Sequence, residues 1–197
     1  MKSSELKMVA LTWLRYYKQM SYVATEAGPW RADVFGANEK KSIELEVKVD
    51  AADLEHEFVK TKHAYYAHPS GKRHVWVPTY FYFMVPENLR DRAVTLVEQK
   101  AHWYGVLSVR QDPSGSFCEV PYRRVSVYRR PKILVAGDPH KELFAELTHR
   151  MASEICGFHM LRDVYGRAFD DVRGLIQRTA AAPVPANTCE EDEPCPT

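Results

Sequence analysis

The sequence lacks any long hydrophobic run, and no stretch approaches the roughly 20 apolar residues that a membrane-spanning helix needs. The first 20 residues contain apolar side chains, but charged residues interrupt them, so we interpret this segment as part of the fold rather than as a signal peptide. The G-x-x-x-x-G-K-[ST] motif is also absent, which excludes a P-loop nucleotide motor in this chain. We therefore expect a cytoplasmic protein with no membrane partner.

Cysteine is scarce, and neither positive nor negative charge is in large excess. The four cysteines form no C-x-x-C pair, so neither a zinc ribbon nor a thioredoxin-like centre is expected. The histidines show no spacing typical of a metal site. The formal net charge is only +1, although residues 180–197 carry four acidic residues and no basic one. The rest of the chain is therefore modestly basic, which is compatible with a polyanionic partner but does not establish one.

The spacing of apolar residues predicts an α/β protein with a mixed sheet flanked by helices. Ser3 or Ser4 is expected to cap a first helix, in which apolar residues recur every three or four positions. Three strands follow, YVATEA, RADVFG and SIELEVKV, the last of which alternates apolar and polar residues. A helix over DAADLEHEFVKTKHAYYAH comes next, with Asp50 or Asp53 as its candidate cap. An apolar central strand TYFYFMVP, another helix and the strand YGVLSV follow.

The C-terminal part of the chain is expected to form a basic strand, RRVSVYRRP, and a helix from about Pro139 to Ala168. This helix has apolar residues to spare, which could support a homodimer or the docking of a partner protein. The sequence that follows contains too few bulky apolar residues to pack. We therefore expect one domain over residues 1–170 and a disordered acidic tail over residues 171–197.

Three polar residues on neighbouring strands carry most of the functional signal. Glu46 and Lys48 are two positions apart on one predicted strand, so their side chains leave the same face, and Asp33 can lie opposite them. Two close carboxylates repel each other unless a cation bridges them, and carboxylates completed by water and phosphate suit Mg²⁺. A lysine beside such a metal can orient the attacking water or help to deprotonate it, and it can also offset charge on a phosphoryl group. The alternative is an ordinary solvated face of the sheet.

The run RADVFGANEKKSIELEVKVDAADLEHEF, followed by KTKHAYY and YFYFMVP, resembles the PD-(D/E)xK nuclease superfamily. The likeness is to small bacterial and phage members, similar to the MmcB-like DNA repair nucleases, and covers about residues 20–135. It implies a restriction-endonuclease-like core, with a mixed central sheet in the order αβββαβ and an added C-terminal helix. It also implies a metal-dependent hydrolase that acts on DNA phosphodiester bonds in repair, restriction or mobile-element or phage biology.

The resemblance assigns roles to individual residues. It implies that Asp33 and Glu46 bind Mg²⁺, which Mn²⁺ can replace, and that Lys48 is the catalytic lysine. It further implies that the Val47 carbonyl touches the metal. Many members add an upstream glutamate, for which Glu26 is the candidate, with an exposed surface position as the alternative.

Basic and aromatic residues near this constellation are candidate nucleic-acid contacts. They are Arg31, Lys60, Lys62 and Tyr65, to which the segment YRRVSVYRRPK adds Arg123 and Arg124. Cations interleaved with aromatic rings suit nucleic acid, but a solvated helix face or an edge strand protected by charge explains the same residues. The sequence therefore leaves two functions open: a DNA nuclease, or an inactive protein of the same fold that binds DNA or a partner protein.

Overall fold

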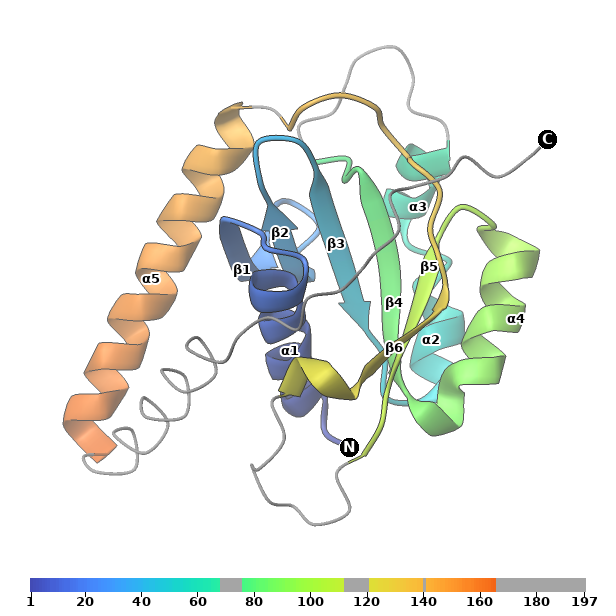
Figure 1. Cartoon of the computed structure of the whole chain (residues 1–197), viewed down its shortest axis with the longest axis horizontal. Helices are drawn as coiled ribbons and strands as arrows, with labels where there is room; N and C mark the ends of the chain where they lie inside the picture. The colour runs from blue at the N-terminus through green and yellow to red at the C-terminus, as the bar shows by residue number, and fades with distance from the viewer. Residues whose placement is uncertain (68–75, 112–120, 140, 166–197) are drawn as a thin grey trace.

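The computed structural model describes residues 1–67, 76–111, 121–139 and 141–165. Figure 1 shows one twisted sheet with helices on both faces and a long helix beside its first strand. Within these ranges no helix is both long and apolar enough to cross a membrane. The expected tail, residues 171–197, lies outside the described residues.

The sheet contains six strands that lie side by side in the order of the sequence. They are β1 (Tyr22–Ala27), β2 (Ala32–Ala37), β3 (Ser42–Val47), β4 (Tyr80–Pro86), β5 (Gly105–Val109) and β6 (Val125–Arg129). β1, β2 and β3 pair antiparallel, β3, β4 and β5 pair parallel, and β6 runs antiparallel to β5. The predicted mixed sheet is therefore confirmed, with TYFYFMVP in the interior of the sheet.

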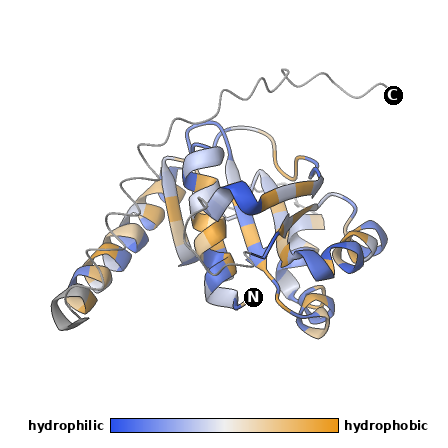
Figure 2. Ribbon diagram, turned by 60° about the horizontal axis from the view of Figure 1, so that its bottom comes forward, coloured by the Kyte–Doolittle hydropathy of each residue, from blue (hydrophilic) through white to orange (hydrophobic). Residues whose placement is uncertain are grey.

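Helices cover both faces of the sheet and one edge. They are α1 (Ser3–Thr12), α2 (Ala51–Glu57), α3 (Thr61–Ala67), α4 (Arg90–Lys100) and α5 (Lys141–Tyr165), with a π-helical turn (Trp13–Tyr17) and two 3-10 turns (Glu87–Leu89, Pro121–Arg124). Leu6 of α1 shares an apolar cluster with Leu45 on one face of the sheet. Leu54 of α2 shares another cluster with Phe81 on the opposite face. Figure 2 shows that hydrophobic residues concentrate where the helices meet the sheet.

Two sequence predictions about helices are wrong in detail. Neither Ser3 nor Ser4 caps α1; Lys2 occupies the cap position without a side-chain hydrogen bond. The helix predicted from Asp50 does begin there, because the Asp50 carboxylate accepts a hydrogen bond from the Asp53 amide at 2.8 Å. It is not continuous, however, but ends at Glu57 and restarts as α3.

α5 packs against the sheet through its first half, where Arg150 and Glu154 also hydrogen-bond to Thr25 of β1. Leu143 and Leu147 are buried against β1 and β2, whereas Ile155 and Leu161 are 54% and 51% exposed. Figures 1 and 2 show the second half of the helix extending beyond the sheet. The helix predicted from Pro139 to Ala168 is thus confirmed over residues 141–165.

Candidate functional site

Asp33 lies beside the backbone of Val47, at the end of β3. The antiparallel register pairs Val34 with Leu45, which brings the preceding residue of β2 to this point. Asp33 Oδ2 accepts a hydrogen bond from the Val47 amide at 2.9 Å. Asp33 Oδ1 lies 2.7 Å from the Lys7 ammonium of α1. One oxygen is therefore fixed by β3, and the other is neutralised by a lysine from α1.

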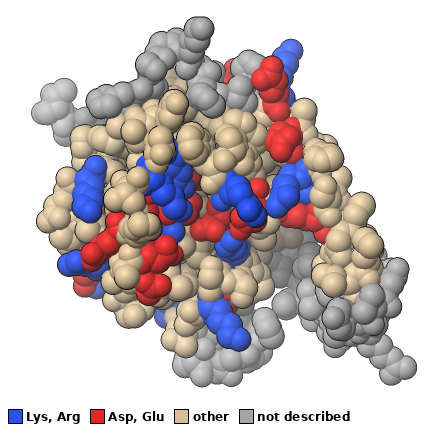
Figure 3. Space-filling model, turned by 180° about the vertical axis from the view of Figure 1, so that it is seen from behind, with Lys and Arg blue, Asp and Glu red and all other residues tan. Residues whose placement is uncertain are grey.

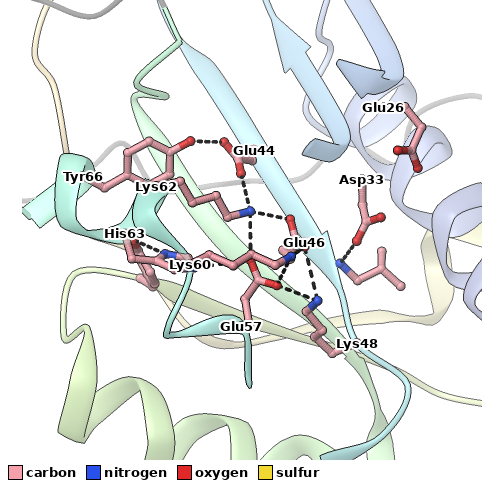
Figure 4. Close-up of polar contacts among 12 residues, drawn as sticks. Glu26, Asp33, Glu44, Glu46, Lys48, Glu57, Lys60, Lys62, His63 and Tyr66 are labelled. Carbon is pink, nitrogen blue, oxygen red and sulfur yellow. Dashed lines mark hydrogen bonds and ion pairs between the residues drawn. The ribbon is translucent and has the colours of Figure 1, made fainter. Parts of the chain in front are cut away.

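Glu46 and Lys48 meet on the opposite side of the same strand end. Glu46 Oε1 lies 3.3 Å from Lys48 Nζ, and each side chain is only 5% exposed. Lys48 Nζ also lies 2.7 Å from Glu57 Oε2 and 3.3 Å from Asp53 Oδ1. Figure 4 shows the Glu46 carboxylate turned toward α3 and away from Asp33. The structure thus unites two of the three predicted catalytic residues and places the third on the adjacent strand.

Glu57, the last residue of α2, is the centre of this charged cluster. Its fully buried carboxylate lies 2.7 Å from Lys48 Nζ, 2.5 Å from Lys60 Nζ and 3.0 Å from Lys62 Nζ. His63 Nε2 approaches the same carboxylate at 3.3 Å. Burial by itself raises the pKa of Glu57, but the hydrogen bond with His63 and the Lys62 and Lys48 charges hold that pKa well below its usual range. Glu57 therefore stays ionised and fixes the lysines around it.

α3 closes the cluster with two side chains one turn apart. Lys62 Nζ lies 3.2 Å from Glu44 Oε1 and 2.7 Å from Glu46 Oε2. The Tyr66 hydroxyl donates a hydrogen bond to Glu44 Oε2 at 2.6 Å. Lys62 is 1% exposed, so the alternative of a solvated helix face is wrong for this residue.

The solvated-sheet alternative is also wrong for β3. The parallel register places Glu44 beside Phe81 and Glu46 beside Phe83 of β4. The two glutamates of β3 therefore lie on the same face of the sheet as the two phenylalanines, which form the aromatic row. α2, α3 and α4 cover the aromatic row, and they cover the glutamates with it. Glu44 and Glu46 are 1% and 4% exposed. Buried charges of this kind persist only when they are paired, as the three lysines pair them here.

Burial also changes the acidity of Glu46. Burial raises the pKa of this carboxyl, the Lys62 charge opposes the rise, and the negative charges of Glu57, Asp33 and Glu44 add to it, so that the pKa is about 7. A carboxyl that titrates near neutral pH inside a cluster of charges is typical of functional sites.

The raised pKa of Glu46 predicts a pH-dependent stability. Because the folded state holds the proton up to about pH 7 and the unfolded chain loses it near 4.5, this group lowers the unfolding free energy as pH rises through that window. At about 1.4 kcal/mol per pKa unit, the loss is roughly 3 kcal/mol. We expect Glu46→Gln to gain stability relative to wild type between pH 5 and pH 8, measured by urea denaturation in EDTA. Parallel pH profiles for the two proteins would contradict the assignment.

Glu26, the predicted additional ligand, belongs to a separate cluster on β1. Its carboxylate lies 2.5 Å from Lys7 Nζ and 3.6 Å from the Arg31 guanidinium. Figure 4 shows Asp33 between Glu26 and Glu46 in this view. Lys7 therefore links Glu26 to Asp33, and both acids reach the same cation.

The predicted nucleic-acid contacts differ widely in exposure. The side chains of Arg31 and Lys60 are 76% and 48% exposed, and Tyr65 is 47% exposed. Arg123 is exposed, whereas Arg124 is buried and lies 3.6 Å from Glu5. Lys62 and Arg124 are thus placed for internal ion pairs, and the other four residues are placed where a ligand can reach them.

The oxygen atoms near Val47 are of the chemical type that hard divalent cations prefer. Asp33, Glu46 and the Val47 carbonyl supply the kind of donors that Mg²⁺ binds, with water and phosphate completing the shell. Across the described ranges, no three His, Cys, Asp or Glu side chains converge as a metal site made of protein side chains alone. Lysines neutralise both carboxylates in this structure.

Several residues of the site were not identified from the sequence. Lys7 lies on α1, and its partners lie on β1 and β2, so no local pattern connects them. The His63 imidazole contacts the Tyr104 hydroxyl at 2.7 Å, and both residues lie in the aromatic core. The i, i+4 spacing of Lys62 and Tyr66 is the one available signal, since it places them on one helix face.

Comparisons of this chain with protein-family models, with curated proteins and with solved structures find no match. Function is therefore inferred from the residues and their geometry.

Proposed function

We propose that this protein is a Mg²⁺-dependent nuclease that hydrolyses DNA phosphodiester bonds, with a restriction-endonuclease-like core of the PD-(D/E)xK type. The observation that carries the proposal is the juxtaposition of Asp33, bonded to the Val47 amide, with the buried pair of Glu46 and Lys48 at the end of β3. The order α1, β1, β2, β3, α2, α3, β4, with β4 parallel to β3, supports the proposed core.

In this proposal Asp33, Glu46 and the Val47 carbonyl hold the metal. When bound, a divalent ion polarises a phosphoryl oxygen and lowers the pKa of a bound water. Asp33 supplies the oxygen that now faces Lys7, while its other oxygen stays on the Val47 amide. Glu46 exchanges a lysine partner for the metal, which favours the same ionised carboxylate.

Lys48 acts in this proposal as a fixed positive charge. Burial lowers the pKa of its ammonium, but the carboxylates of Glu46 and Glu57 outweigh burial and raise that pKa above its usual value. Lys48 therefore keeps its proton at neutral pH. A protonated lysine can orient water through a hydrogen bond and offset charge on the phosphoryl group, but it is not available as a general base.

DNA is the proposed substrate because two exposed cations contact acids of this region: Lys60 lies 3.4 Å from Glu46, and Arg31 lies 3.6 Å from Glu26. Figure 3 shows Lys and Arg side chains interspersed with Asp and Glu over this face, without one continuous basic surface. Discrete cations such as Arg31 and Lys60 would bind phosphates and position the backbone without reading its sequence.

One observation favours a second function. Each predicted acidic ligand already has a lysine partner, with Lys7 on Asp33 and Lys62 on Glu46. A nuclease fold that has lost metal chemistry would look the same if the lysines were permanent replacements for the ion. Such a protein would bind DNA or a partner protein, the latter through the exposed half of α5.

Calorimetric titration with Mg²⁺ and Mn²⁺ separates the two functions. The nuclease proposal predicts a saturable heat for the wild-type protein, and a loss of at least tenfold in affinity for Asp33→Asn, which removes one ligand charge. Glu55→Gln is the matched control, because Glu55 is an exposed acid of α2 paired with Arg92. Absence of a metal-binding heat together with tight, salt-sensitive DNA binding would favour the binding protein.

A further inference from the structure

Two aromatic rings lie together at the surface beside the candidate site. Trp30 lies in the turn between β1 and β2, and Tyr65 lies on α3; their ring centroids are 5.6 Å apart and tilted by 45°. Neither ring is part of the three apolar clusters of the described core. Tyr65 is 47% exposed and Trp30 is partly exposed. The pair therefore offers aromatic surface beside the candidate site that the described apolar clusters do not use.

The turn that carries Trp30 has a fixed shape. Gly28 has φ +73°, and a Cβ at this position would lie 2.5 Å from the Trp76 ring, so only glycine fits. The Arg31 amide closes the turn by donating a hydrogen bond to the Gly28 carbonyl at 3.1 Å. Trp30 therefore lies in a turn whose backbone conformation is fixed by these contacts.

α3 fixes the second ring relative to the charged cluster. The residue after Tyr65, Tyr66, donates a hydrogen bond to Glu44, and Lys62, one turn earlier, contacts Glu46 at 2.7 Å. On the other side, Trp30 precedes Asp33 by three residues, which limits their Cα separation to about 11 Å. The ring pair thus adjoins both proposed metal ligands, and the exposed Arg31 lies next to it in the chain.

We propose that Trp30 and Tyr65 form a stacking platform for an unpaired nucleobase, so that the substrate is single-stranded DNA or a duplex end with an unpaired strand. This inference deepens the proposed function and rests on it for the nature of the ligand. Inside a duplex the faces of each base are covered by its neighbours, whereas an unpaired base leaves its faces open to protein rings. Arg31 and the half-exposed Lys60 then contact the phosphates on either side.

The test is the binding of a fluorescein-labelled dT20 strand and of a 20-base-pair duplex by the full chain, measured by anisotropy in EDTA so that no cleavage occurs. We expect the wild-type protein to prefer dT20, and Trp30→Ala and Tyr65→Ala each to weaken dT20 binding by about tenfold or more while the duplex affinity changes less than twofold. Trp30→Phe, which keeps an aromatic face, should restore most of the affinity.

Tyr128→Ala is the matched control. Tyr128 is 45% exposed on β6, the edge strand at the opposite end of the sheet from β1, and its hydroxyl accepts a hydrogen bond from Arg90 at 3.0 Å. Its removal should cause no strand-selective loss. An equal loss for strand and duplex in the Trp30 and Tyr65 variants, or no loss, would overturn the platform. Strand-selective binding without any Mg²⁺-dependent cleavage would preserve the platform and refute the nuclease. Cleavage of a single strand that Trp30→Ala leaves unchanged would preserve the nuclease and refute the platform.

Discussion

Asp33→Asn and Lys48→Met are expected to lose DNA cleavage by about 100- to 1000-fold in the presence of Mg²⁺, as is typical when one preorganised electrostatic contact to a transition state is removed. Asp33→Asn keeps a side chain of the same shape next to the Val47 amide but removes the charge that would hold the metal. Lys48→Met removes a protonated ammonium that the carboxylates of Glu46, Asp53 and Glu57 hold in place. The measurement is the initial rate of nicking of supercoiled plasmid and of cleavage of a labelled single strand.

Two controls make the loss of cleavage interpretable. Glu55→Gln changes an exposed acid on α2 and should cleave at the wild-type rate. Circular dichroism of each variant shows whether it is folded. If Lys48→Met does not fold, Asp33→Asn alone tests the loss of cleavage. Equal rates in wild type, Asp33→Asn and Lys48→Met would mean that the activity comes from a contaminant or from another site.

Lys62→Met is expected to lower the unfolding free energy by about 3–5 kcal/mol, the usual cost of removing one partner from a buried ion pair. Lys62 is 1% exposed, and its ammonium lies within 3.2 Å of three glutamate carboxylates. Without it these carboxylates repel one another in a medium of low dielectric constant. Urea denaturation at pH 7.5 measures the change.

Lys60 provides the matched comparison for Lys62. It belongs to the same cluster and contacts Glu57 at 2.5 Å, but its side chain is 48% exposed. Lys60→Met should therefore cost no more than about 1 kcal/mol. Adding Glu44→Gln to Lys62→Met should recover part of the loss, because one buried charge then disappears. If Lys62→Met is as stable as wild type and only weakens DNA binding, Lys62 is a phosphate contact rather than a structural cation.

The strands were predictable because their signals are local. Gly28 with Pro29 and the polar run ANEKK separate β1, β2 and β3, and the alternation in SIELEVKV sets which residues share a face. The burial of the β3 face that carries Glu44 and Glu46 was not predicted, although the prediction of a covered central strand for β4 implied it. If β4 is covered on both sides, its parallel neighbour β3 is covered as well, and Glu44 and Glu46 lie beside Phe81 and Phe83.

The break between α2 and α3 had no sequence signal. No glycine or proline occurs between Glu57 and Thr61, and the chain turns there through short i to i−3 hydrogen bonds at Val59 and Lys60. Its cause is tertiary, because Glu57 at the end of α2 and Lys62 at the start of α3 meet the same charges from β3. Pairings of this kind depend on how separate elements meet, so a single sequence does not show them.

The most direct measurement of the central claim is a crystal of the full chain soaked in Mn²⁺ and examined by anomalous diffraction. The account predicts one anomalous peak in contact with carboxylate oxygens of both Asp33 and Glu46, beside the Val47 carbonyl, with the Lys7 ammonium displaced from Asp33. The same soak of Asp33→Asn should give no peak at this position. A wild-type crystal in which Lys7 and Lys62 remain on these carboxylates at saturating Mn²⁺, with no peak between them, would contradict it.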